Sequence, residues 1–172
     1  MGGPLRPSKG KGRRTQLKVR DIMTKGPVFC HPDSNLAVAA EKMWSHDCGI
    51  LPVVDDELGV VGVITDRDIC IAFGTKDRRA SSVLVREVMT TKVHICAPED
   101  DIHTALKVME KGRVRRLPVT NREGKLMGIL SMDDIVLVAE VRVGPKIPEL
   151  ACEEVVEAYK EIRVRPFPAV PA

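Results

Sequence analysis

Two pairs of a hydroxyl and a carboxylate stand at the same spacing in this sequence. Thr65 precedes Asp68 by three residues, and Ser131 precedes Asp134 by three residues. At the start of a helix such a pair forms a capping box, in which both side chains satisfy free backbone N–H groups. The same place can also hold a ligand, because a helix N-terminus attracts phosphate and an ionised carboxylate can accept hydrogen bonds from both hydroxyls of a ribose. These residues alone leave both interpretations open.

The two pairs lie in matching positions of an internal repeat. Residues 19–69 align with residues 85–135 at a fixed offset of 66 without a gap, and 15 of the 51 pairs are identical. Chance would give about three at ordinary residue frequencies. Gly62 and Gly128 also match, in the middle of apolar runs where a glycine indicates close approach of another backbone or of a ligand. A tandem duplication in a chain of 172 residues predicts two halves that form one compact body.

Each copy predicts the same order of elements. A short strand, at 28–30 or 93–96, precedes an amphipathic helix, and two apolar runs around a polar turn, at 55–58 or 121–125, predict an antiparallel hairpin. A second helix follows, starting at Asp66 or Arg67 with Phe73 turned inward, and near Asp133 in the other copy. The predicted buried faces of the first helices are Leu36, Ala39, Ala40, Met43 and Trp44 in one copy, and Ile102, Ala105, Leu106 and Met109 in the other.

Charge and cysteine content bear on the location of the protein and on its possible partners. The formal net charge is +3, yet residues 1–20 hold seven Lys or Arg and no acid. A solvated basic arm and a nucleic-acid contact both explain this segment. Five cysteines without a CxxC pair, no secretory segment and no apolar run of about 18 residues predict a reduced, cytoplasmic protein without a membrane span.

Several motifs in a fixed order resemble a known family. "VRDIMT", "GILPVVDD" and "GVVGVITDRDI" in the first copy resemble a CBS domain, and "VREVMT", "RRLPVT" and "GILSMDDI" in the second resemble its partner. Together they resemble a stand-alone Bateman module. The resemblance implies an α/β fold of two pseudo-symmetric β-α-β-β-α repeats. We therefore expect a flexible basic arm at 1–18, repeat 1 at 19–80, repeat 2 at 81–140, and a helix at 149–162 with a proline-rich tail in 141–172.

The resemblance also implies a function and a set of site residues. Members of this family bind adenosine-containing ligands, here AMP, ADP, ATP or S-adenosylmethionine, and regulate another protein or act through their own dimer. By the same likeness Thr65 and Ser131 contact phosphate, while Asp68 and Asp134 bind the ribose. The apolar residues available to enclose a flat base are Ile50, Pro52, Ile64, Pro118 and Leu130, although core packing explains them equally well.

The two copies differ where charge matters most. Arg115 and Arg116 precede the Leu-Pro dipeptide of the second copy, where the first copy has Gly49 and Ile50. The resemblance implies that a basic residue here holds phosphates; an exposed surface patch is the alternative. No catalytic motif and no metal-ligand spacing is present, so we expect neither an enzyme nor a metal site. A structural oligomerisation module with empty clefts and a nucleic-acid-associated protein remain alternatives.

Overall fold

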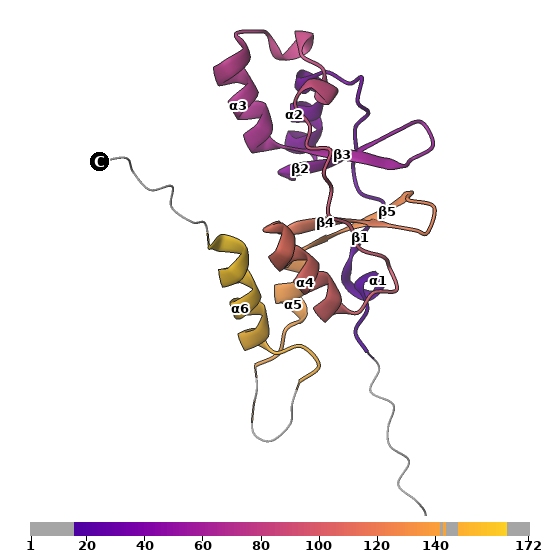
Figure 1. Ribbon diagram of the computed structural model, residues 1–172, viewed down its shortest axis with the longest axis vertical. Coiled ribbons are helices and arrows are strands. Elements are labelled where there is room, and N and C mark those ends of the chain that lie inside the picture. The colour runs from indigo at the N-terminus through magenta and orange to yellow at the C-terminus, as the bar shows by residue number, and fades with distance from the viewer. Residues whose placement is uncertain (1–15, 142, 144–147, 165–172) are drawn as a thin grey trace, which may run out of the picture.

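The computed structural model describes residues 16–141, 143 and 148–164 and confirms the α/β class (Figure 1). Two bodies with the same elements stack so that their hairpins lie between their helices. The first body contains α2 (Leu36–Ser45), β2 (Ile50–Val54), β3 (Val60–Thr65) and α3 (Asp66–Lys76). The second body contains α4 (Ile102–Gly112), β4 (Arg116–Thr120), β5 (Leu126–Ser131) and α5 (Met132–Val138). The short segments are α1 (Val19–Ile22), β1 (Thr24–Lys25), η1 (Ala80–Ser82) and η2 (Val85–Glu87).

The two predicted hairpins are present in the same register. Ile50 lies opposite Thr65 in the first, and Arg116 lies opposite Ser131 in the second. The tips of the hairpins pair with each other, because the Val60 N–H donates to the Gly124 carbonyl over 3.2 Å and the Leu126 N–H donates to the carbonyl of Leu58 over 2.9 Å. The duplication in sequence is therefore an approximate two-fold symmetry in space.

The predicted strands at 28–30 and 93–96 are wrong in length. Each is reduced to one bridging residue, Cys30 opposite Val53 and Cys96 opposite Val119. The Val54 N–H of β2 donates to the Cys30 carbonyl. The next hydrogen bond of this ladder would need a backbone N–H at position 52, and Pro52 has none. Pro118 has the same effect in the second body. The prolines end the ladder that the apolar pattern predicted.

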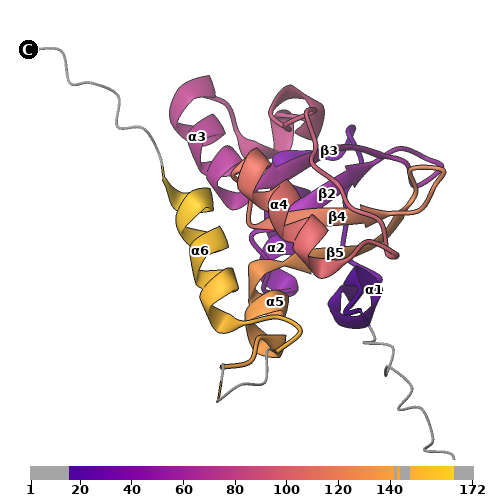
Figure 2. The same cartoon turned by 60° about the horizontal axis from the view of Figure 1, so that its bottom comes forward.

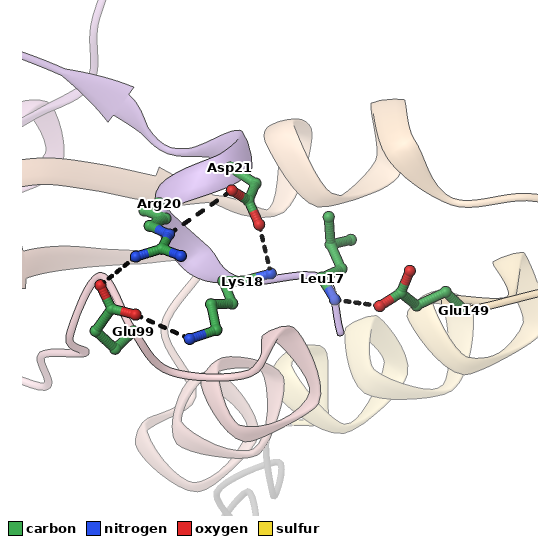
Figure 3. A network of polar contacts seen from close by, with 6 residues as sticks. All are labelled: Leu17, Lys18, Arg20, Asp21, Glu99 and Glu149. Carbon is green, nitrogen blue, oxygen red and sulfur yellow. Dashed lines mark hydrogen bonds and ion pairs between the residues drawn. The ribbon is translucent and has the colours of Figure 1, made fainter. Parts of the chain in front are cut away.

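Each body takes its first segment from the other repeat. The Val19 N–H donates to the Asp100 carbonyl over 3.0 Å, and at the matching position the Val85 N–H donates to the Ser34 carbonyl over 2.8 Å. Val19 is buried in the core of the second body, and Val85 in that of the first. Figure 3 shows the polar contacts that attach the N-terminal segment to the second half: Lys18 and Arg20 both pair with Glu99, and the Leu17 N–H donates to Glu149.

This exchange of first segments between the two bodies accounts for the glycine that recurs at positions 62 and 128. A Cβ at Gly62 would lie 2.8 Å from the Met89 sulfur and 3.1 Å from the Thr90 carbonyl oxygen. A Cβ at Gly128 would lie 2.8 Å from the Met23 sulfur and 2.8 Å from the oxygen of Thr24. Of the two explanations that the sequence left open, close approach of another backbone is the one that these distances support.

A last helix, α6 (Cys152–Arg163), packs against the core of the second body. It begins three residues later than predicted and lies beside α4 and α5 (Figures 1 and 2). Its buried side chains are Val155, Ala158 and Ile162, whereas Val156 and Tyr159 are exposed. None of the described helices combines the length and the apolar character that spanning a bilayer requires.

The corresponding face of the first body has no such cover among the described residues. Trp44 and Phe73, both predicted to be buried, are 89% and 47% exposed. They line a groove of about 460 Å³ between α2 and α3, the α2–α3 groove, together with Met43, Cys48 and Ile69. The periodicity of the helices correctly identified the apolar faces, but it does not reveal which face another element covers.

Candidate functional site

A cavity of about 590 Å³ lies between the two bodies and brings together residues from both repeats. We call it the inter-repeat cavity. Its lining comes from the end of β3 and the start of α3, from the crossing segment 90–94, from the end of α4 and the start of β4, and from the end of α6. Its volume is in the range of small-molecule sites, about 300 to 1,000 Å³.

Thr65 and Asp68 lie at the start of α3 in this cavity and form the predicted capping box. The Thr65 hydroxyl donates to Asp68 Oδ2 over 2.7 Å and accepts from the N–H of Asp68 over 3.2 Å. The Thr65 N–H donates to the same Oδ2 over 2.9 Å. The hydroxyl thus gives its only proton to Asp68. Within the described residues Oδ1 of Asp68 accepts no hydrogen bond, which leaves one carboxylate oxygen for a ligand.

The other N–H groups at the start of α3 are also occupied. The Asp66 N–H donates to the Gly49 carbonyl over 3.2 Å, and the Arg67 N–H donates to Asp66 Oδ1 over 2.7 Å. A phosphate therefore finds few free backbone donors here, although it still meets the positive end of the helix dipole. At the start of α3, the donors for an anion are therefore mainly side chains.

Such side chains are abundant. Six cationic residues line the cavity, against the two carboxylates of Asp66 and Asp68. Within the part of the chain that the structure describes, only Arg116 among the six forms an ion pair, to Asp133 over 3.7 Å. Guanidinium groups bind phosphate oxygens through paired N–H donors. The six are Arg67, Lys92, Arg113, Arg115, Arg116 and Arg163.

Backbone geometry fixes two of the cavity residues. Arg113 ends α4 in the left-handed region, with φ of 51°, a conformation that non-glycine residues rarely adopt. His94 lies against the last turn of α4, where a Cβ on Gly112 would come within 2.7 Å of its ring. Glycine at 112 thus lets the imidazole lie flat against the helix beside the cavity.

The remaining predicted site residues divide into three groups. Ile50 and Pro118 line the inter-repeat cavity, as do both Arg115 and Arg116. Ser131 and Asp134 form the matching capping box, with 2.8 Å between Oγ and Oδ2, but line neither this cavity nor the α2–α3 groove. Pro52 is buried and lines neither of them.

The prediction that Ile64 and Leu130 enclose a base needs correction. Both are 0% exposed and belong to the two cores. Successive side chains of a strand point to opposite faces, so if Thr65 faces the cavity then Val63 shares its face and Ile64 does not. Val63 does line the cavity. Parity along the strand was a signal that sequence reasoning could have used.

Sequence reasoning missed several residues of this cavity, among them Lys92, His94 and Arg163. Lys92 and His94 belong to the crossing segment, and their contact with the first body depends on the exchange between repeats. Arg163 comes from α6, outside the duplicated region. The internal alignment contained a signal for Lys92, since the residue 66 positions earlier is the uncharged Gly26.

Comparison with known proteins identifies the repeats. Residues 19–74 and 85–140 each match the model of the CBS domain. The chain belongs to the CBS domain family. A relative of this CBS pair, the uncharacterized protein MK0525 of Methanopyrus kandleri, is 28% identical over 122 residues, which make up 71% of this chain and 62% of that protein. The chain thus spans less than two thirds of that relative.

Two solved CBS pairs have the same fold and were solved with ligands. The CBS domain pair of protein MJ0100, in complex with 5′-methylthioadenosine and S-adenosyl-L-methionine, has a TM-score of 0.64 and 27% identity, covering 70% of this chain and 93% of that one. CBSX2 of Arabidopsis thaliana, in complex with AMP, has a TM-score of 0.62 and 26% identity, with the same coverage of 70% and 93%.

Proposed function

We propose that this CBS pair binds one phosphorylated adenosine ligand in the inter-repeat cavity and reports its presence to another protein or through its own dimer. The observation that supports this proposal is the position of Asp68, whose Oδ1 is available in a cavity lined by six cationic residues. The carboxylate suits the ribose hydroxyls, and the guanidinium groups suit the phosphates. Ile50, Pro118 and the ring of His94 line the same cavity and are available to contact the base.

The charge of the cavity ranks the ligands that the sequence predicted. AMP, ADP and ATP are anions, whereas S-adenosylmethionine bears a cationic sulfonium. Cations near a cavity attract anions and repel a sulfonium, and the effect grows where water is excluded. We therefore expect affinity to rise from AMP to ATP and S-adenosylmethionine to bind weakly, unlike the pair of MJ0100 that was solved with it.

Thermal unfolding in the presence of AMP, ADP, ATP, S-adenosylmethionine and NAD tests the proposal. A ligand at 100 times its dissociation constant stabilises the folded protein by about 2.7 kcal/mol. We expect ATP and ADP to raise the unfolding temperature most. No shift with any of the five would contradict the proposal and favour a structural module with empty clefts. No catalytic activity is part of the proposal.

A homodimer is the second part of the proposal, through the α2–α3 groove. Trp44 and Phe73 give this face exposed aromatic area that the corresponding face of the second body does not have. We expect Trp44→Arg to lower the dimer fraction in sedimentation equilibrium. Val156→Arg is the matched control, because Val156 is 52% exposed but lies on α6. A wild-type monomer at all concentrations would exclude the homodimer.

The nucleic-acid alternative depends on the basic arm, of which residues 1–15 lie outside the described residues. Deleting residues 1–16 leaves Leu17, whose N–H donates to Glu149. We expect the shortened chain to keep its nucleotide affinity. Loss of DNA or RNA binding on this deletion, compared at one salt concentration, would instead support a nucleic-acid role. The cytoplasmic location expected from the cysteine content remains a prediction.

A further inference from the structure

We propose that α6 is part of the ligand site, and that Arg163 binds the phosphates of the ligand so that ligand binding holds the end of α6 in place. The inference rests on the proposed function, because it needs a phosphorylated ligand in the inter-repeat cavity. Its basis is that Ile162 and Arg163 line this cavity with Arg113 and Arg115. Ile162 and Arg163 lie outside both segments that match the CBS domain.

The two ends of α6 are held differently. At its start, backbone hydrogen bonds of 3.0 Å join Glu140 to Leu150 and Cys152, and Leu150 is 2% exposed. At its end, Ile162 is the last buried side chain. The Arg163 guanidinium lies 5.7 Å from the centre of the Tyr159 ring on the same helix. The start of α6 is thus attached by backbone hydrogen bonds, whereas the end that faces the cavity is held by the burial of Ile162.

The helix dipole favours a cation at this place. The C-terminal end of a helix has a partial negative charge, which repels an anion, and a cation in the last turn offsets it. Arg163 is the last residue of α6 and Lys160 lies one turn earlier. Without Arg163 a phosphate in the cavity would face the negative end of α6 with less compensation. The side chain thus both attracts the ligand and shields it from the dipole.

Reciprocity gives this contact a regulatory consequence. If α6 raises the affinity for the ligand by some factor, the ligand stabilises the docked position of α6 by the same factor. Exposed Val156 and the partly exposed Tyr159 lie on the outer side of this helix. A ligand that holds α6 would therefore fix a surface that another protein can contact.

The test compares Arg163→Ala with Lys160→Ala by calorimetric titration with ATP and with adenosine. Lys160 is the matched control, since it lies on the same helix, pairs with Glu157 over 2.7 Å and does not line the cavity. We expect Arg163→Ala to weaken ATP binding by about tenfold, which corresponds to about 1.4 kcal/mol, and to change adenosine binding by less than about twofold. Lys160→Ala should match the wild type for both ligands.

Hydrogen exchange supplies a second measurement. ATP should slow amide exchange in residues 155–163 of the wild type and of Lys160→Ala, but not of Arg163→Ala. If the wild type binds ATP and Arg163→Ala binds it equally well, the inference is wrong while the proposed function stands. Equal losses in both variants would also overturn it, because a general charge effect would then suffice. A wild type that binds no phosphorylated ligand rejects both proposals.

Discussion

The two halves of this chain share their backbone design but not their charges. Five of the six cationic residues of the inter-repeat cavity lie within the duplicated region, and moving each of the five by 66 positions leads to a residue without positive charge: Arg67 corresponds to Asp133, Lys92 to Gly26, Arg113 to Asp47, Arg115 to Gly49 and Arg116 to Ile50. The capping boxes, by contrast, are nearly identical in geometry. Symmetry of the fold thus coexists with a strong asymmetry of charge.

A second difference concerns the helices. In the second body α6 covers α4 and α5, whereas the matching face of the first body leaves Trp44 and Phe73 exposed. The end of α6 also reaches the inter-repeat cavity. The added helix therefore increases the charge asymmetry, because it brings Arg163 to the side that already holds the other cations.

The largest expected effect is on phosphate recognition. Replacing Arg115 and Arg116 together with alanine should lower ATP or AMP affinity about tenfold to a hundredfold, since a charge-assisted hydrogen bond contributes about 1.5 to 3 kcal/mol. Adenosine affinity should change little. Titration of wild type and variant gives both numbers.

The control for this experiment is a variant with the same loss of charge elsewhere. Lys107 and Arg122 are exposed and do not line the cavity, so their double replacement with alanine should leave binding unchanged. Equal losses for ATP and adenosine in the Arg115 and Arg116 variant would mean that these arginines support the fold rather than the phosphates.

A smaller effect, on stability, should distinguish the two places where a segment of one repeat passes close to the hairpin of the other, at Gly62 and at Gly128. Gly62→Ala and Gly128→Ala each force a Cβ against a methionine sulfur and a carbonyl oxygen, and overpacking of this kind costs about 1 to 3 kcal/mol. Gly128→Ala should destabilise more, because the carbonyl oxygen is 2.8 Å from its Cβ rather than 3.1 Å. Urea unfolding measures both. A neutral Gly128→Ala would show that the backbone can yield at this crossing.

The smallest expected effect concerns the two buried cysteines, Cys30 and Cys96, compared with exposed Cys70. Burial raises the pKa of Cys30 to about 11 and that of Cys96 to about 12. Both thiols should resist alkylation at pH 8, whereas exposed Cys70 reacts. Mass spectrometry of the labelled native protein checks this, and rapid modification of Cys30 or Cys96 would contradict it.

The same shifts predict a fall in stability at alkaline pH. The unfolded thiols lose their protons near 9.0 while the folded ones keep theirs, so the unfolded chain is favoured as pH rises above 9. Unfolding in urea at pH 8 and at pH 10 measures this contribution. Replacing Cys30 and Cys96 with alanine should make the fall less steep.

Local chemistry in the sequence predicted the elements but not their exchange. The capping boxes, the hairpins and the helix faces follow from spacing within about ten residues, and all are present. Val19 is buried in the second body and Val85 in the first, so each makes long-range contacts with the other repeat. Hydrophobic periodicity does not encode such contacts. Lys92 and His94 were missed for this reason. Trp44 was assigned to the interior because no local pattern shows that, among the described residues, no helix covers it.

The matched aspartates give the most direct test of the central claim, that the chain has one phosphate-binding cavity rather than two. Asp68→Ala and Asp134→Ala each remove a capping box of the same geometry, so the losses of helix stability should match. Calorimetric titration with ATP should find one site per wild-type chain, weakened about tenfold or more by Asp68→Ala and unchanged in Asp134→Ala. Two sites per chain, or equal losses of affinity in the two variants, would contradict the account.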